Sequence, residues 1–412
     1  MSSLLDRVVA QYLDSGDFNG LLHAPASPAD LEDVVALLRD GLVEVVSEED
    51  FPNPHVRPWA TRRTVEAQVE SLRRAMAREI GLCLYPTEAA LASRVPPTLF
   101  AESPFSRRLA LGAGQLDSAF FRFDVLEPYR NDPRFRFEPH DVGVDISISD
   151  DEYVDPNTPD LDKTAIHHVG FAYDVKSLKG DTPIIRRVCA ALTDLAGLTP
   201  EHQQRWRTYE VPASETLQPH PVWLGIQAGD WPDGLGAFDR LIEELRAWNE
   251  LHRGAFGVDL LRRLDRPREL SWVLRPSQSE FDGFIHHLDK LLSENLENSA
   301  LNAMGAPERD AQGQKLGTLK RLDGFLQRQD LADDERARIM APLYTVRAAR
   351  NKPAHAPRTN VTDVTLVRTQ AEVLRDVTRS VHALRAFWAR HPKNADWECP
   401  EILLPGKPHY WL

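Results

Sequence analysis

The final third of the chain carries the pattern that most restricts its fold. Apolar side chains there recur at spacings of three and four residues, which place them on one face of a helix. Four stretches show this pattern: Phe281, Phe284, Ile285, Leu288, Leu291 and Leu292; Leu319, Leu322, Phe325 and Leu326; Leu343 and Val346; and Val373, Leu374, Val377, Val381, Leu384 and Trp388. A helix with one apolar face needs another apolar surface to cover it. We therefore predict a four-helix bundle over residues 276–395, whose third helix starts at Pro342, and a separate tail over residues 396–412.

The pattern of residues 1–60 predicts that they form a separate small unit. An amphipathic stretch covers residues 4–13, and a second helix begins with a serine N-cap, Ser27, followed by proline. A strand over residues 42–46 and a second over 55–59 would then form a two-stranded wing. This order resembles a winged helix. Because the second helix, LEDVVALLRD, is acidic, we expect it to contact protein or to be structural rather than to bind DNA.

Residues 61–275 mix helical and strand signals, so the chain as a whole is predicted to be α+β. Helical periodicity covers residues 63–79, 200–208 and 234–252. The alternating apolar residues of a half-buried strand are Val142, Val144, Ile146 and Ile148. We expect this region to sense a signal or to regulate the bundle.

Charge and composition exclude several classes of protein. The formal net charge of -13 is opposite to that of a protein that coats nucleic acid, so a nucleic-acid site has to be local. No apolar run approaches the ~18 to 20 residues that cross a bilayer, and the start of the chain lacks the basic and then apolar order of a secretion signal. We therefore expect a cytoplasmic protein without membrane contact. The cysteines Cys83, Cys189 and Cys399 lack CxxC spacing, and we expect them to be reduced and structural.

The string RNKPAH, from Arg350 to His355, follows the third apolar stretch. Arg followed directly by Asn, with His five residues after the Arg, is expected by chance about 0.04 times in a chain of this composition, by a count of template matches. Pro353 removes an amide donor and disfavours helical geometry at Lys352, which predicts that the helix ends there. Residues five apart on a helix diverge by about 140°, so this ending lets Arg350 and His355 converge.

These residue types suit the cleavage of RNA without a metal ion. A His that titrates near neutrality is able to move a proton at the 2'-hydroxyl or at the leaving 5'-oxygen. Arg offers a permanent planar charge to the phosphate in the transition state, and Asn351 could orient a phosphate oxygen or the His. Between Arg336 and Lys393 there are twelve Lys or Arg and three acidic residues, so positive charge is concentrated locally.

A helical bundle with this motif at the end of its third helix resembles the HEPN superfamily. The resemblance implies a metal-independent endoribonuclease without a cofactor, acting as a regulated toxin or antiviral-defence effector in a prokaryote. Its catalytic residues would be Arg350, Asn351 and His355, and the neighbouring residues that would bind RNA are Arg347, Lys352 and Arg358. It also implies a homodimer through the bundle, because two copies of the motif would supply both a base and an acid. A regulatory protein or nucleic acid would bind the N-terminal region.

Two other interpretations stay open. The chain could be a non-catalytic winged-helix and HEPN adaptor or regulator that binds nucleic acid or a partner protein, with Arg350 capping a helix C-terminus. Alternatively, the acidic stretch over residues 149–163 could belong to a metal nuclease with Asp160, Asp174 and Lys176, although its prolines favour a solvated loop.

Further polar residues lie near the predicted bundle site or form pairs elsewhere. In the first helix of the bundle, Asp289, Lys290 and Glu294 are candidates for a further polar group at the motif, whereas the adjacent pair His286-His287 is expected to be structural. The pair His167-His168 has no third ligand at helical or hairpin spacing, so we expect no zinc site there.

Overall fold

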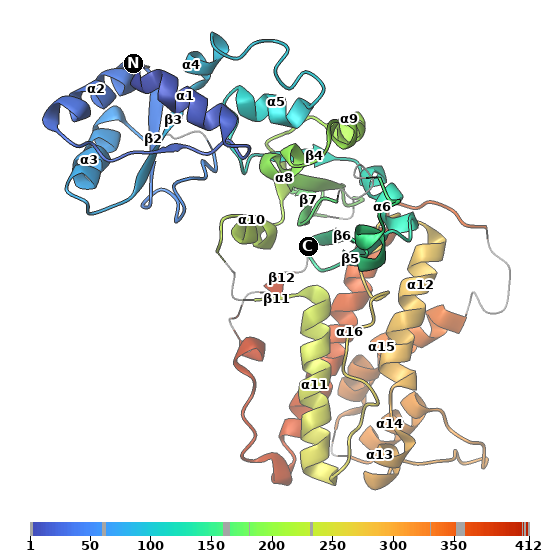
Figure 1. The fold of residues 1–412 in the computed structure, drawn as a ribbon. Helices are drawn as coiled ribbons and strands as arrows, with labels where there is room; N and C mark the ends of the chain where they lie inside the picture. Colours follow the sequence, from blue (N-terminus) through green and yellow to red (C-terminus); the bar gives the residue numbers. More distant parts are fainter. Residues whose placement is uncertain are drawn as a thin grey trace. The chain divides into compact units, whose positions relative to one another are not determined.

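The computed structural model describes residues 3–59, 63–159, 165–180, 182–230, 234–329, 331–351 and 359–405, residue 407 and the backbone of residues 409 and 410. The described residues divide into two compact units. The first lies within residues 1–138, 143–173 and 186–232, and the second within 139–142, 174–185 and 233–412. Helices and strands mix in the first unit, and helices dominate the second (Figure 1). The expected α+β class with a helical C-terminal region is confirmed.

The first unit begins with three helices and a small antiparallel sheet. The helices are α1 (Leu4–Asp14), α2 (Pro28–Arg39) and α3 (Val65–Met76), and the strands lie in the order β1 (Leu21–Leu22), β3 (Leu82–Pro86) and β2 (Val43–Ser47). Ser3, Ser27 and Thr64 each accept a hydrogen bond from the amide three residues further on, which stabilises the starts of the three helices. Every residue of the central strand β3 is buried, so this strand lies in the core.

The two-stranded wing expected at residues 42–59 is wrong. β2 pairs with β3, which follows α3, and residues 55–59 form no strand. Prolines at positions 52, 54 and 58 deprive this segment of amide donors. The side chain of Arg57 also turns inward, where it contacts Glu44 and the carbonyl oxygen of Gly112. The small sheet therefore extends to Pro86, beyond the boundary expected at residue 60.

A larger sheet makes up much of the remaining first unit. Its strands lie in the order β5 (Phe135–Pro139), β6 (Gly143–Ile148), β7 (Val169–Asp174), β8 (Arg186–Ala191), β4 (Ser118–Phe121) and β9 (Glu210–Val211), and β10 (Leu217–Pro219) pairs with β7. The alternation expected along residues 142–148 is confirmed in β6, where Val144 and Ile146 are buried and Asp145 between them is exposed.

The other helical segments of the first unit are short. They are α4 (Glu88–Ala92), α5 (Pro104–Ala110), the 3-10 turn η1 (Phe123–Leu126), α6 (Glu127–Asn131), α7 (Asp150–Val154), α8 (Leu192–Ala196), α9 (Pro200–Tyr209) and α10 (Pro221–Gln227). Trp206 of α9 is fully buried, packs edge-on against Phe121 with ring centroids 4.8 Å apart, and donates a hydrogen bond to the hydroxyl of Tyr129. This side chain therefore joins α9 to β4 and α6.

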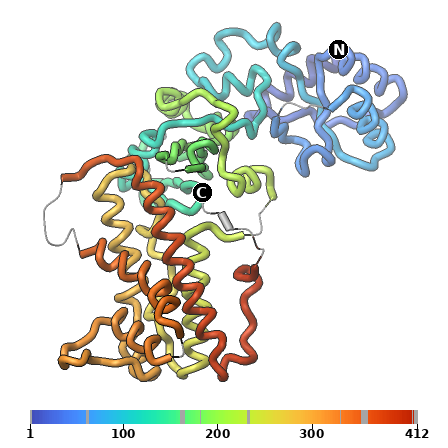
Figure 2. Tube along the Cα trace, turned by 180° about the vertical axis from the view of Figure 1, so that it is seen from behind, coloured from blue at the N-terminus to red at the C-terminus, as the bar shows by residue number. Residues whose placement is uncertain are grey.

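The second unit is built around two long helices, α11 (Ala237–Phe256) and α16 (Leu366–Ala389), which lie side by side (Figures 1 and 2). Glu244 contacts Arg385, and one turn further along α11 the ring of Trp248 packs on that of Trp388, with centroids 5.6 Å apart. The two helices therefore run in the same direction. The other elements are β11 (Leu235–Gly236), α12 (Gln278–Asp289), the π-turn η3 (Lys290–Glu294), α13 (Asn298–Ala303), α14 (Thr318–Leu326), α15 (Asp333–Asn351), η5 (Pro392–Asn394), η6 (Glu401–Leu403) and β12 (His409–Tyr410).

The four helices expected in the bundle are present as α12, α14, α15 and α16. Their apolar faces are buried, as the exposures of Leu288, Leu322, Val346 and Val377 show, none of which is above 1%. Hydrophobic burial of these faces is the main stabilising contribution to the unit. Among the described residues, no helix is long and apolar enough to cross a membrane.

Two details of the bundle differ from expectation. The third helix starts at Asp333 and not at Pro342, which lies inside it. Its first turn carries Asp333, Asp334 and Glu335, and negative charge there is favoured by the helix dipole. In addition, α11 belongs to the same compact unit, so the boundary expected at residue 276 cuts through that unit.

Candidate functional site

The predicted motif begins in the last described turn of α15. Arg347, Arg350 and Asn351 all lie on this helix, and Asn351 is exposed. The expected site residues Lys352, His355 and Arg358 lie outside the described residues.

Arg350 is held by two carboxylates of the neighbouring helical segment. Its Nε lies 3.6 Å from Oδ2 of Asp289, and its Nη2 lies 2.9 Å from Oε1 of Glu294. The two acids differ in exposure, because the side chain of Asp289 is 1% exposed and that of Glu294 is 43% exposed. Arg350 itself is 27% exposed, so its guanidinium is anchored and still reaches solvent.

Arg347 shares the buried carboxylate with Arg350. Its Nη1 lies 2.7 Å from Oδ2 of Asp289 and donates to Oγ of Ser293 at 3.2 Å. The Ser293 hydroxyl lies 2.9 Å from Oδ1 of the same Asp289, so both carboxylate oxygens have partners. The contacts with two guanidinium groups and a hydroxyl offset the cost of removing this buried carboxylate from water. Arg347, which was expected to bind RNA, is therefore paired within the protein, as Arg350 is, and its side chain is 39% exposed.

A change of helical geometry brings the two carboxylates to one place. On a regular α-helix, residues five apart such as Asp289 and Glu294 would diverge by about 140°. Here α12 continues into the π-turn η3, and the amide of Asn295 bonds the carbonyl of Lys290, five residues earlier. A π-turn returns the fifth residue to nearly the same face, and such turns are frequent at functional sites. Asp289 and Glu294, both candidates from the sequence, therefore contact the same arginine.

Glu294 also lines a cavity of about 600 Å³. The walls come from η3 and from the loop at residues 262–269, and include Lys290, Arg263 and Asp265. Asn295 fixes this loop, because its side chain accepts a hydrogen bond from the amide of Arg263 and donates one to the carbonyl of the same residue. Nothing in the sequence had pointed to residues 262–269, because the loop carries no apolar periodicity and no motif.

The charges of the cavity are partly compensated by other residues. Arg262 pairs with Glu297, and Arg266 pairs with Asp141 and Asp239. Burial raises the pKa of Asp141, although the charge of Arg266 opposes this shift. Desolvation also lowers the pKa of His287, which lines the same cavity, so the neutral imidazole is favoured there.

The metal-nuclease interpretation gains no support from the described residues. Asp174 accepts a hydrogen bond from the amide of Lys176, as in an Asx-turn, and Asp160 lies outside the described residues. His168 lies 3.2 Å from the exposed carboxylate of Asp145. Within the part of the chain that the structure describes, no three His, Cys, Asp or Glu residues are grouped so that they could hold a metal ion.

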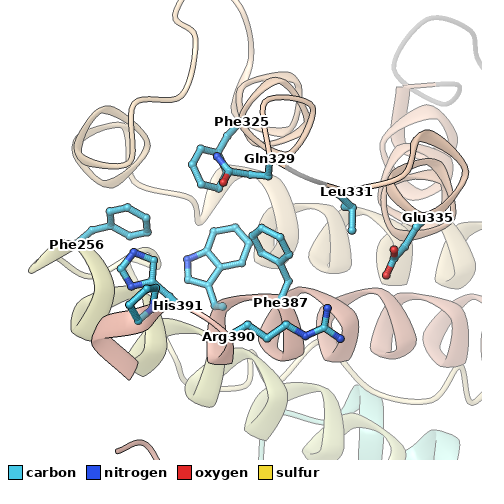
Figure 3. A pocket seen from close by; sticks show the side chains of 10 residues that line it. Phe256, Phe325, Gln329, Leu331, Glu335, Phe387, Arg390 and His391 are labelled. Atoms are coloured by element: carbon cyan, nitrogen blue, oxygen red, sulfur yellow. The ribbon is translucent and has the colours of Figure 1, made fainter. Parts of the chain in front are cut away.

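A second cavity, of about 350 Å³, lies at the other end of α15. Aromatic side chains from α11, α14 and α16 line it, including Phe256, Phe325 and Phe387, and Glu335 lies at its edge (Figure 3). Glu335 is fifteen residues before Arg350 on one helix, which corresponds to about 22 Å along the helix axis. This apolar cavity is therefore separate from the predicted site.

A buried ionic cluster on α11 was not predicted from the sequence. The carboxylate of Glu244 is fully buried and contacts Arg240, His382 and Arg385. Burial raises the pKa of Glu244, but the hydrogen bonds from His382 and Arg385 outweigh it and hold the pKa below its ordinary value. Arg240 also donates to the carbonyl oxygen of Leu403, so the cluster ties the C-terminal tail to the unit.

The cysteines offer no activated thiol in the first unit. Cys83 and Cys189 are buried free thiols. Burial raises the pKa of Cys83 to about 12 and that of Cys189 well above its ordinary value, so both are protonated at neutral pH. A structural role suits them.

Comparison with known proteins identifies no relative of this chain. No protein-family model matches it, and neither the curated proteins nor the solved structures contain a match.

Proposed function

We propose that the second unit is a metal-independent endoribonuclease in which Arg350 contacts the scissile phosphate. The observation that supports this proposal is the state of Arg350: its guanidinium is held by the buried Asp289, is 27% exposed, and pairs with Glu294, which lines a charged cavity. A preorganised cation at the surface stabilises charge that develops on a phosphate without costly rearrangement.

The proposed reaction needs no metal ion because the substrate supplies its own nucleophile. The 2'-hydroxyl of the RNA attacks the adjacent phosphorus, and the bond to the 5'-oxygen breaks. Arg350 offsets the negative charge on the phosphate oxygens. Asn351 orients one of these oxygens, and His355 transfers a proton at one end of the reaction. Lys352 and Arg358 are proposed to hold flanking phosphates.

The resemblance to HEPN domains extends the proposal to assembly and role. The active form is a homodimer in which two copies of the motif face one cleft. The protein acts in the cytoplasm as a regulated toxin or antiviral-defence effector, and the first unit receives the regulatory signal from a protein or a nucleic acid. Static light scattering tests the dimer, and a monomer in the fully active state contradicts it.

An RNA cleavage assay in excess EDTA tests the activity. The wild-type protein should cut RNA and leave 2',3'-cyclic phosphate and 5'-hydroxyl ends, whereas DNA, which lacks the 2'-hydroxyl, should stay intact. Arg350→Ala and His355→Ala should each abolish cleavage. Arg338→Ala is a matched control, since Arg338 is an exposed arginine of the same helix that pairs with Asp334. Cleavage that needs a divalent ion and survives His355→Ala refutes the proposal.

The same contacts favour a second candidate, a non-catalytic adaptor. Asp289 joins α12 to both arginines of α15, as a purely structural clamp between two helices would. In that case Arg350→Ala lowers the stability of the second unit and the wild-type protein has no ribonuclease activity. Ribonuclease activity of the wild-type protein therefore separates the two candidates, and thermal unfolding of the variants measures the structural part of the contact.

A further inference from the structure

We propose that Glu294 is the general base of the ribonuclease reaction, which accepts the proton of the attacking 2'-hydroxyl. This inference rests on the proposed function. A single motif offers one His for two proton transfers, one at the 2'-oxygen and one at the leaving 5'-oxygen. A second proton-transfer group beside Arg350 would supply both transfers from each protomer, so that the proposed homodimer would hold two complete sites.

The geometry separates Glu294 from the residues that only position Arg350. Asp289 lies 3.6 Å from Nε of Arg350, is 1% exposed and accepts hydrogen bonds from two further groups, which suits an anchor. Glu294 contacts Nη2 of the same guanidinium at 2.9 Å and lies 3.9 Å from Nη1 of Arg347, but it is 43% exposed. A carboxylate that served only as an anchor would gain little from this exposure, because solvent weakens ion pairs.

The position of Glu294 also gives a substrate access to it. The residue ends the π-turn η3 and lines the cavity of about 600 Å³ that the loop at residues 262–269 completes. Glu294 is the residue that belongs both to this cavity and to the ion pair of Arg350. A phosphate bound at Arg350 would place the neighbouring ribose within reach of this carboxylate, since a guanidinium has five donors and can serve a phosphate and a carboxylate together.

The proposed step balances without an additional reactant. The ionised carboxylate of Glu294 takes the proton of the 2'-hydroxyl as the 2'-oxygen forms its bond to phosphorus. The bond from phosphorus to the 5'-oxygen breaks, and this oxygen takes a proton from His355, which acts as the general acid. The products are a 2',3'-cyclic phosphate and a 5'-hydroxyl. Glu294 then returns its proton to solvent.

Glu294→Gln tests the assignment, because the amide keeps the shape and cannot accept the proton. The kcat for RNA cleavage should fall on the order of 100-fold or more, the usual contribution of a general base, while KM and the melting temperature change little. The matched control is Glu401→Gln. Glu401 pairs with Lys407 at 2.7 Å, is 79% exposed and does not line the cavity, so its variant should cleave RNA like the wild type.

A second substrate distinguishes a base from an acid. In an RNA whose leaving 5'-oxygen is replaced by sulfur, the sulfur leaves without taking up a proton. A variant that lacks the general acid therefore regains activity on this substrate, and a variant that lacks the general base does not. Glu294→Gln should therefore remain inactive on this substrate, whereas His355→Ala should recover. Full activity of Glu294→Gln on ordinary RNA, or its recovery on the sulfur substrate, overturns the assignment. Absence of cleavage by the wild-type protein refutes the proposed function itself.

Discussion

Replacement of Asp289 by Asn should destabilise the second unit strongly. The carboxylate is 1% exposed and compensates the charges of Arg347 and Arg350. Removing one partner of a buried ion pair costs about 3 to 5 kcal/mol. Here the two guanidinium groups are 39% and 27% exposed, and Glu294 remains beside Arg350, so water and the second acid take up part of the loss. We expect the free energy of unfolding to fall by about 2 to 3 kcal/mol.

Differential scanning calorimetry measures this change as a shift of the transition that belongs to the second unit. For a unit of this size the expected decrease in Tm is roughly 4 to 12 °C. Asp334→Asn is the control, because Asp334 forms an ion pair with Arg338 in which both side chains are more than 70% exposed. Loss of such an exposed ion pair costs about 0 to 1 kcal/mol, so this variant should change the Tm only slightly. If the two variants melt together, Asp289 is not the anchor of α15 and the reasoning is wrong.

Three further outcomes test other parts of the structure. Burial raises the pKa of Asp194 to about 6, and the charge of His168 opposes this only in part. The folded protein therefore holds a proton that the unfolded chain has lost, so stability falls as the pH rises from about 4 to 6. Asp194→Asn should consequently stabilise the first unit by about 2 to 3 kcal/mol above pH 6 and have little effect below pH 4, and equal effects in melts at pH 4 and pH 7 would contradict this. A Cβ on Gly170 would lie 2.5 Å from the ring of the buried Trp223, so Gly170→Ala should cost more than about 2 kcal/mol. Gly283→Ala, at a position of α12 where an added Cβ would have no neighbouring atoms, should stabilise the second unit by about 0.5 to 1 kcal/mol in urea titrations. If Gly283→Ala destabilises the protein more than Gly170→Ala does, the packing described here is wrong. A thiol reagent should modify Cys399, which is partly exposed, well before Cys83 and Cys189, which are buried, as peptide mapping by mass spectrometry can measure.

The helical part of the fold could be predicted because its information is local. The spacing of apolar residues in α12, α14 and α16 coincides with the faces that are buried. Strand pairing is not local in this sense. β2 follows a helix and pairs with β3 across α3, and no feature of residues 42–59 reveals that the partner lies beyond residue 80. The start of α15 was misplaced for a different reason, since Pro342 gave a start signal although the helix passes through it.

The charge of the candidate site could be predicted only in part. A count along the sequence between Arg336 and Lys393 gives a large excess of basic residues. In the folded unit several of these find acids from other elements: Arg336 pairs with Asp323, Arg347 with Asp289 and Arg385 with Glu244. Such pairs depend on tertiary packing, and the sequence count therefore overstates the free positive charge.

In the proposed site, one carboxylate anchors the guanidinium and another accepts the proton, because a single carboxylate could not do both. A group that fixes a guanidinium has to be buried, because burial strengthens the ion pair and restricts its movement. A group that accepts a proton from a substrate has to be accessible. Asp289 meets the first requirement and Glu294 the second, on one arginine, because the π-turn η3 brings them to the same face. Their variants should therefore differ in kind: Asp289→Asn should lose stability and RNA cleavage together, whereas Glu294→Gln should lose cleavage and keep the melting temperature of the wild type. If both variants lose stability equally, both acids are anchors, and the base of the reaction has to be sought elsewhere.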